Sequence, residues 1–304
     1  MIAFFANIFG YVLNFIYEIV KNYGLAIIIF SILIKVLMIP LSIKQQKTMK
    51  KSTKIQKKLK EIQFKYKNNP EMLNQATMEV YKSENMSPFS GCLSAIVQII
   101  LLFAVFYLVR SPLTYMEKVN PDIINKYSKI VKENNLSTNS AYPEIEVIRE
   151  LNNIKKLKEN NTENIENNSE NNEEKTDLAE INDEELNSLD INMNFLGLNL
   201  AQIPTRSGDW KAFIIPVLYV LVSVISLRIT NPTPKKKDGE EKNSEDEFDP
   251  MAQMNKNMNL MFPVMYLAVA LIAPLGLALY WLMNSLLMII ERLALNKMLK
   301  DEEE

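Results

Sequence analysis

Long apolar runs separated by charged segments dominate this sequence of 304 residues. A hydrocarbon core about 30 Å thick takes roughly 20 helical residues, so an apolar run of that length predicts a membrane span. The run over residues 258–291 is too long for one span, and Pro274 and Gly276 divide it into two short ones. The pattern predicts an all-α polytopic membrane protein with a five-span helical bundle. The predicted spans are residues 22–44, 88–110, 210–228, 258–273 and 274–291.

The N-terminal segment, residues 1–21, is apolar but carries a regular set of polar positions. They recur at steps of four and three residues, which places them on one stripe of a helix. A helix with one polar stripe and a broad apolar face is typical of the membrane interface, so we predict an interfacial amphipathic helix. A sixth span or an uncleaved signal is the alternative. The segment has no basic start and no small-residue cleavage site, which argues against a cleaved secretory signal.

Residues 45–87, between the first two spans, are rich in lysine, which predicts a cytoplasmic location. Apolar residues recur at steps of four and three from Ile55 to Tyr66, and Asn69-Pro70 then ends that helix before a second one begins. We predict a cytoplasmic helical hairpin with a thin apolar seam. It is either a basic anchor alone or also a surface for a partner or anionic lipid. The lysines expected to contact a partner are Lys50, Lys54, Lys57, Lys58 and Lys65.

The number of predicted spans assigns each remaining segment to one side of the membrane. Residues 111–209 are predicted to be an extracytoplasmic loop, and its Asn- and Glu-rich part, residues 157–187, shows no helical period. That composition predicts a disordered acidic insertion and no folded second domain. Residues 229–257 form a cytoplasmic linker and residues 292–304 a cytoplasmic tail. We therefore expect the N-terminus outside and the C-terminus inside, and the absence of an organelle targeting segment favours a bacterial plasma membrane.

A single lysine, Lys35, lies in the middle of the first predicted span. A charge near the centre of a bilayer costs roughly 3 kcal/mol or more unless water or protein surrounds it. The candidate acids, Glu18 and Glu291, lie at membrane edges, and the interior of the predicted spans contains no Asp or Glu. Lys35 therefore indicates a hydrated polar cavity inside the membrane. A structural ion pair with an acid is the alternative.

Composition excludes several kinds of chemistry. The formal net charge of −2 conceals the separation between a basic loop and an acidic one. This separation, and not the net charge, indicates how the chain is organised. The chain has one cysteine, Cys92, and no histidine, which excludes an internal disulfide, zinc sites of the usual kind, and Ser-His-Asp or Cys-His pairs. None of its 7 glycines is spaced as in a phosphate-binding loop. We predict no catalytic site and no metal site.

Four segments of the chain form a specific family signature when they occur together and in this order, although any one of them alone is weak evidence. They are NYGLAIIIFSILIKVLMIPLSIKQ (22–45), KEIQFKYKNNPEML (60–73), SPFSGCLSAIVQI (87–99) and PLGLALYWLMNSLLMIIE (274–291). Their order resembles the YidC/Oxa/Alb family of membrane protein insertases, in the short, Gram-positive-like form without a large external domain. The resemblance implies an insertase and chaperone for newly made membrane proteins that works alone or beside the Sec translocon.

The same resemblance implies partners and the absence of cofactors. The implied partners are nascent membrane proteins and membrane lipids, with the Sec translocon, the ribosome and the signal recognition particle receptor as further candidates. No cofactor, nucleotide or DNA is implied. One departure concerns the C-terminus, because relatives often end in a basic tail that can touch ribosomal RNA, whereas this chain ends KMLKDEEE. The long external insertion is a second departure.

Family members use a hydrophilic groove with one basic residue in the first conserved span, and that position matches Lys35. The family usually has arginine there; lysine keeps the charge but loses the planar fork that holds a carboxylate at two points. Each further groove candidate has an ordinary alternative, which is packing or a hydrogen bond between neighbouring helices. These candidates are Ser31, Gln98, Tyr280, Trp281 and Asn284.

Three other functions compete with insertion. A transporter is disfavoured because carriers normally place acids within the membrane. An anion channel with a lysine-lined pore is a second alternative, although one lysine makes a poor filter unless the protein oligomerises. A passive membrane receptor that recruits ribosomes through the basic hairpin is the third. Anion currents would favour the channel, ribosome flotation the receptor, and rescued insertion the insertase.

Overall fold

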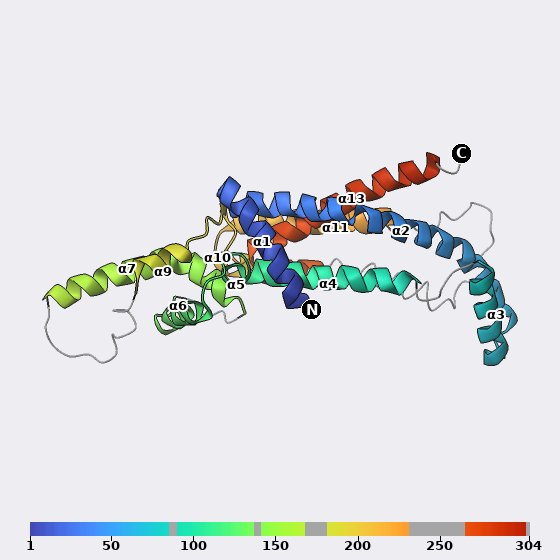
Figure 1. Cartoon of the computed structure of the whole chain (residues 1–304), viewed down its shortest axis with the longest axis horizontal. Helices are drawn as coiled ribbons and strands as arrows, with labels where there is room; N and C mark the ends of the chain where they lie inside the picture. Colours follow the sequence, from blue (N-terminus) through green and yellow to red (C-terminus); the bar gives the residue numbers. More distant parts are fainter. Residues whose placement is uncertain (85–89, 137–140, 168–180, 231–264, 302–304) are drawn as a thin grey trace. The chain divides into compact units, whose positions relative to one another are not determined.

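The computed structural model describes residues 1–84, 90–136, 141–167, 181–230 and 265–301. The chain divides into two compact units: Met1–Leu33 with Ala104–Arg292, and Ile34–Phe103 with Leu293–Glu304. The helices, labelled in Figure 1, are α1 (Ile2–Val20), α2 (Tyr23–Lys65), α3 (Pro70–Ser83), α4 (Ser90–Arg110), α5 (Pro112–Tyr115), α6 (Pro121–Glu133), α7 (Pro143–Asn167), α9 (Asp183–Ser188), α10 (Pro204–Ser207), η2 (Trp210–Phe213), α11 (Ile214–Thr230) and α13 (Leu275–Asp301). Within the described ranges, a two-stranded antiparallel sheet of β1 (Asn194–Phe195) and β2 (Leu198–Asn199) accompanies them.

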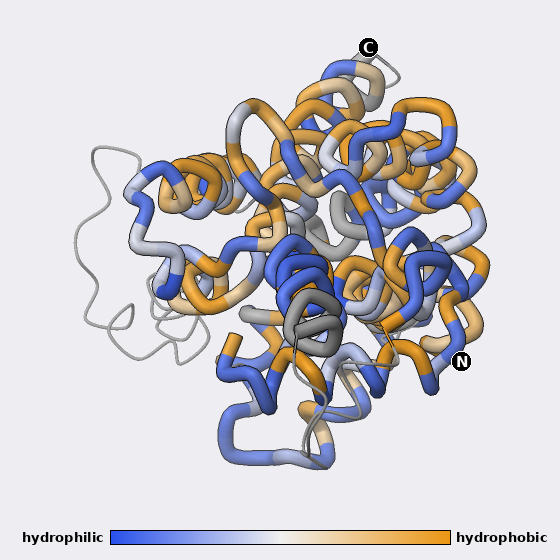
Figure 2. The backbone as a smooth tube through the Cα atoms, turned by 90° about the vertical axis from the view of Figure 1, so that its left-hand side faces the viewer, coloured by the Kyte–Doolittle hydropathy of each residue, from blue (hydrophilic) through white to orange (hydrophobic). Residues whose placement is uncertain are grey.

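Four of these helical stretches are long and apolar enough to cross a membrane: Ile2–Val20, Tyr23–Thr48, Trp210–Ile229 and Leu275–Met298. A shorter apolar helical stretch is Ile96–Arg110. Figure 2 shows predominantly hydrophobic residues along these helices and hydrophilic ones along α7. The fold is all-α and polytopic as predicted, apart from the small sheet.

Helix α1 matches the predicted N-terminal helix, and its two faces explain its pattern. Ala6, Leu13 and the glycine Gly10 lie on the buried face, where a Cβ on Gly10 would come within 1.7 Å of the Tyr115 carbonyl oxygen of α5. Large apolar side chains cover the exposed face. They are Phe4, Ile8, Tyr11, Phe15 and Ile19. Because α1 is also a candidate span by length and composition, its placement in the interface stays a prediction.

The first predicted span and the first arm of the hairpin are one helix of 43 residues, α2, rather than two elements. The helix continues because the lysine- and glutamine-rich sequence beyond residue 44 consists of good helix formers, and the membrane boundary at that residue stays a prediction. Pro40 lies inside the helix. At the other end of the chain, α13 likewise continues through the predicted tail to Asp301.

The helical hairpin belongs to the second unit. Asn69 caps α3, because its side-chain oxygen accepts a hydrogen bond from the Met72 amide at 3.1 Å, and Pro70 occupies the first turn. Ile55 is buried, whereas the other seam positions are half-buried. Lys58 contacts Glu84 at 2.6 Å, and this hydrogen bond lowers the pKa of the Glu84 carboxyl.

The predicted extracytoplasmic loop contains packed helices, which belong to the first unit and are not separated from it as a second domain. Helices α6 and α7 pack together and bury, among others, Tyr127, Ile130, Ile148 and Ile154. The Asn- and Glu-rich stretch is helical through residue 167 and again in α9, while residues 168–180 lie outside the described ranges. Apolar residues spaced along α6 and α7 supply enough buried surface to order it.

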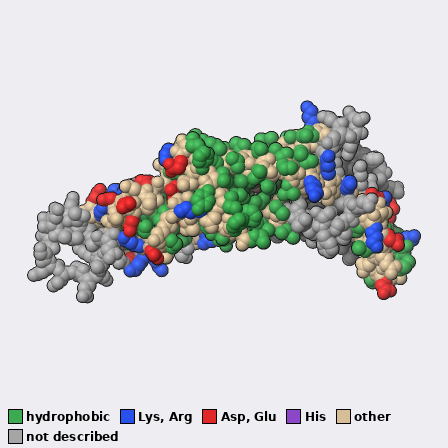
Figure 3. Space-filling view, in the orientation of Figure 1, with side chains coloured by type: hydrophobic (Ala, Val, Ile, Leu, Met, Phe, Trp, Pro, Cys, Tyr) green, Lys and Arg blue, Asp and Glu red, His purple; other side chains and the backbone are tan. Residues whose placement is uncertain are grey.

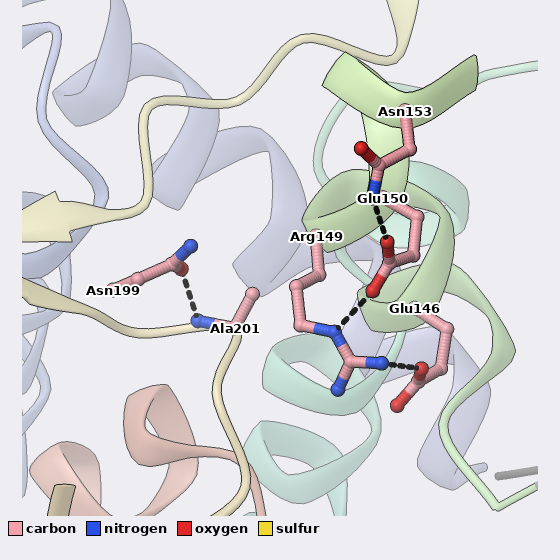
Figure 4. Close-up of polar contacts among 6 residues, drawn as sticks. All are labelled: Glu146, Arg149, Glu150, Asn153, Asn199 and Ala201. Atoms are coloured by element: carbon pink, nitrogen blue, oxygen red, sulfur yellow. Dashed lines mark hydrogen bonds and ion pairs between the residues drawn. The ribbon is translucent and has the colours of Figure 1, made fainter. Parts of the chain in front are cut away.

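Ion pairs and hydrogen bonds hold α6, α7 and α9 together. Figure 4 shows the Arg149 guanidinium between the carboxylates of Glu146 and Glu150. Lysines of α6 and α7 reach acids of α9 and of the turn that comes after it. These pairs are Lys126–Glu185, Lys158–Asp183 and Lys155–Asp190. In Figure 3, charged side chains gather over α7 and α9, and hydrophobic ones cover much of the spanning helices of the same unit.

Residues 192–202, which we call the brace, fasten the ends of three long helices within the first unit. Three hydrogen bonds of Asn192 reach these helix ends: its carbonyl accepts from the Tyr23 amide at 3.0 Å, its amide donates to the Tyr17 hydroxyl at 2.9 Å, and its side chain donates to the Lys21 carbonyl at 3.0 Å. These bonds join the end of α1 to the start of α2.

The other end of the brace caps α13. The Leu275 amide donates to the Gln202 carbonyl and the Gly276 amide to the Leu200 carbonyl, both at 2.9 Å. Asn199 orders the turn between them, because its side-chain oxygen accepts from the Ala201 amide at 2.9 Å (Figure 4). The first amides of α2 and α13, which lack partners within their own helices, therefore find them in one segment.

The close approach of α1 to α5 generates a first prediction. Gly10→Ala places a methyl group onto a backbone carbonyl, so the helix must move, and we expect overpacking to cost about 1–3 kcal/mol. This outweighs the gain in helix propensity, which is at most about 1 kcal/mol. Thermal unfolding in detergent micelles, followed by circular dichroism, should show a lower midpoint. The exposed Ile8→Ala in the same helix is the control, and wild-type stability of Gly10→Ala would contradict the packing described.

The buried carboxylate of Glu144 generates a second prediction, which concerns the dependence of stability on pH. Glu144 accepts hydrogen bonds from the Thr114 amide at 3.0 Å and hydroxyl at 2.7 Å, yet burial outweighs them and raises its pKa above the ordinary 4.5. The folded state then binds the proton more tightly than the unfolded state, so stability falls as pH rises from 4.5 through the raised pKa. Glu144→Gln should flatten this dependence in thermal unfolding. If the variant shows the same dependence of stability on pH as wild type, the raised pKa of Glu144 is contradicted.

Candidate functional site

Two of the predicted groove residues, Lys35 and Gln98, lie in the second unit. Lys35 is half-buried on α2. Gln98 is exposed on α4, and its side-chain amide donates to the side-chain oxygen of Gln45 on α2 at 3.0 Å. Gln98 thus makes an ordinary interhelical hydrogen bond, which is the alternative to a groove role.

A second amide pair in the same unit was missed by sequence reasoning. Gln46 is only 4% exposed, and its side-chain nitrogen donates to the side-chain oxygen of Asn296 on α13 at 2.6 Å. Consecutive residues of α2 therefore hold α4 and α13 by side-chain amides. The signal in the sequence was the Gln45-Gln46 pair directly after the apolar run, but the partners lie 53 and 250 positions away.

The other four groove candidates lie in the first unit. Ser31 is buried, and its hydroxyl donates to the Ile27 carbonyl one turn earlier at 2.7 Å. Tyr280 is buried on α13, whereas Trp281 and Asn284 are half-buried on the same helix. Because the six candidates are divided between two units, their assembly into one groove stays a prediction.

Trp281 belongs to an aromatic cluster that the sequence did not reveal. The Tyr219 ring of α11 lies 5.8 Å from the Trp281 ring and 5.9 Å from the Tyr266 ring, measured between centroids. Nearby, the hydroxyls of Ser223 and Ser285 lie 3.4 Å apart and join α11 to α13. These contacts give the predicted fifth span a polar and aromatic contact surface on α11 rather than a purely aliphatic one.

The structure describes the side chains of two of the five predicted hairpin lysines. Lys58 makes the ion pair with Glu84, and the exposed Lys65 lies 5.3 Å from the centre of the Tyr66 ring. The side chains of Lys50, Lys54 and Lys57 lie outside the described part of the structure. The backbone places all five lysines on α2.

Comparison with known proteins gives one family over most of the chain. The model of the family described as 60Kd inner membrane protein matches residues 15–303. This confirms the family resemblance drawn from the four sequence segments.

Similar curated proteins carry a consistent name. A protein named membrane protein insertase YidC from Fusobacterium nucleatum is 44% identical over 102 residues, which is 34% of this chain and 50% of that protein. Proteins of the same name from Caldanaerobacter subterraneus and Chlorobaculum parvum are 38% and 46% identical over 36% and 33% of this chain, and over 53% and 17% of their own lengths. The aligned part thus spans half or less of most of these relatives. On the family match, this multi-pass membrane protein belongs to the 60Kd inner membrane protein family, the family of the YidC/Oxa insertases.

Proposed function

We propose that this chain inserts newly made membrane proteins into the lipid bilayer, alone or beside the Sec translocon. The observation that carries the proposal is the family match over residues 15–303 combined with a cation, Lys35, at the middle of an apolar helix. Relatives named membrane protein insertase support the same assignment. The proposed substrates are nascent membrane proteins.

In the proposed mechanism, Lys35 attracts an acidic segment of the incoming chain halfway across the bilayer. At about 4 Å and an effective dielectric constant of about 20, two opposite charges attract by roughly 4 kcal/mol, which lowers the barrier to crossing. The apolar helix of the substrate then moves into lipid, and burial at about 25 cal/mol per Å² drives the step. Hydration around Lys35, not a chemical reaction, is what this mechanism requires.

The remaining polar groups have supporting roles in the proposal. Gln98, which lies in the same unit as Lys35, lines the groove with it. Ser31, Tyr280 and Asn284 belong to the other unit, so their place in the groove stays a prediction. Trp281 offers an aromatic wall for apolar segments. The amide pairs at Gln45 and Gln46 support it by holding α2 against its neighbours near the predicted cytoplasmic end of the span.

The proposed orientation puts the N-terminus outside and the hairpin and C-terminus in the cytoplasm. The lysine-rich arm of α2 then faces the side from which new chains arrive. In this proposal the hairpin docks the ribosome, the signal recognition particle receptor or the Sec translocon. Lys65 is exposed to such a partner, whereas Lys58 is already engaged by Glu84.

Substitution of Lys35 tests the mechanism directly. We expect Lys35→Ala and Lys35→Glu to lower insertion of a single-span protein with an acidic external tail by about tenfold or more, because a charge attraction of several kcal/mol is lost. Lys35→Arg should retain insertion, since the charge remains. The measurement is protease protection of the substrate in vesicles reconstituted with each purified variant and with none.

The matched control is Lys44→Ala, which removes the same charge from an exposed position on the same helix and should insert like wild type. A substrate whose tail carries lysines in place of its acids should reverse the order, so that Lys35→Glu inserts it better than wild type. Equal insertion by all Lys35 variants would refute the cation mechanism. Insertion no greater than in protein-free vesicles would refute the insertase function itself.

A further inference from the structure

The turn of the β1–β2 hairpin carries a leucine in an unfavourable backbone conformation. Leu196 has φ 49° and Gly197 has φ 78°, so both central residues of this two-residue turn are left-handed. Asn-Gly is the usual choice in such a turn, and the left-handed backbone conformation is unfavourable for a residue such as leucine. Leu196 is 86% exposed, so no packing within the described protein offsets that cost.

The hairpin is fixed at the level where an apolar helix begins. The Asn22 side chain donates to the Asn194 carbonyl at 2.6 Å, beside the Tyr23–Asn192 bond of the brace. The Phe195 ring lies against Gly24, where an added Cβ would come within 2.4 Å of the ring. The hairpin therefore cannot move away from the first turn of α2 without losing these contacts.

The apolar surface of the candidate span starts at the same level. Leu25, the third residue of α2, is 44% exposed, and exposed apolar side chains continue along the helix from there. At a rise of about 1.5 Å per residue, Leu25 lies only about 3 Å along the axis from Tyr23. The hairpin is thus continuous with a surface that faces lipid if α2 spans the membrane.

The tip also has the chemistry of the membrane interface. Residues 195–198, Phe-Leu-Gly-Leu, carry no charge. Elsewhere in the first unit, Trp210 is 73% exposed at the first residue of the candidate span Trp210–Ile229, and tryptophan at a span end is typical of the interface.

We propose that the β1–β2 hairpin inserts Leu196 into the lipid at the membrane surface, next to the N-terminal end of α2. Transfer of a leucine side chain from water to an apolar medium is favourable, which offsets the cost of its backbone conformation. The lipid surface then holds the brace, through Phe195, against the helix ends that it caps. This inference depends on the spans and not on the insertase function.

Fluorescence of a labelled tip tests this proposal in the full chain. Cys92 is replaced by serine, because it is the only cysteine, and Leu196→Cys is labelled with the environment-sensitive nitrobenzoxadiazole dye. The protein is reconstituted into vesicles of phosphatidylcholine and phosphatidylglycerol, with and without lipids that carry a quencher just below the headgroup. Asn187→Cys, on the exposed surface of α9 in the same unit, is the matched control, and circular dichroism checks that both variants keep their helices.

We expect blue-shifted emission and strong quenching by the labelled lipid at position 196, with emission typical of water and little quenching at position 187. Both leaflets contain the quencher, so the orientation of the protein in the vesicle does not affect the result. Water-like, unquenched emission at position 196 would overturn the proposal. Equal quenching at both positions would also overturn it, because the whole external part would then lie on the membrane and the tip would have no special contact.

Discussion

Backbone groups at the ends of membrane helices need hydrogen-bond partners, and one short segment of this protein provides them for the end of α1 and the starts of α2 and α13. The brace accepts hydrogen bonds from the first amides of α2 and α13 and also ties down the end of α1 through Asn192. An unsatisfied backbone group away from water costs several kcal/mol, so these contacts constrain where the helices can begin. Helices α6, α7 and α9 precede the brace in the chain, and the Lys155–Asp190 ion pair ties α7 to a residue two positions before it.

The proposed function depends on a different property, which is polarity placed inside an apolar scaffold. Lys35 lies on a helix whose neighbouring side chains are largely aliphatic, and the amides of Gln45 and Gln46 lie beyond it toward the basic arm. Charged groups crossing a bilayer are costly, and a hydrated cation halfway across reduces that cost for an acidic segment. Insertion by this route uses the partition of the substrate into lipid as its source of free energy.

The sequence predicts the long helices and singles out Lys35 as a candidate functional residue, because both features appear as simple local patterns. Apolar length identifies the candidate spans, and Lys35 is conspicuous against its run. The packing of α6, α7 and α9 was missed because attention to the Asn- and Glu-rich composition passed over the regularly spaced apolar residues Ile145, Ile148, Leu151 and Ile154, which come before it in the chain. The Gln46–Asn296 and Tyr219–Trp281 contacts could not be predicted, since they join residues far apart in the chain and only tertiary packing fixes them.

In the proposed mechanism a substrate passes along the face of α2 that carries Lys35, and site-specific photocrosslinking tests this path while leaving that lysine intact. A photoreactive residue at Ile32 or Ile39, three before and four after Lys35, lies on its face of the helix, whereas Leu33 and Leu37 lie on the other side, and all four side chains are exposed. With a ribosome-bound single-span substrate, we expect strong crosslinks from positions 32 and 39 and weak ones from positions 33 and 37. Equal yields from both faces, or stronger crosslinks from 33 and 37, would contradict it.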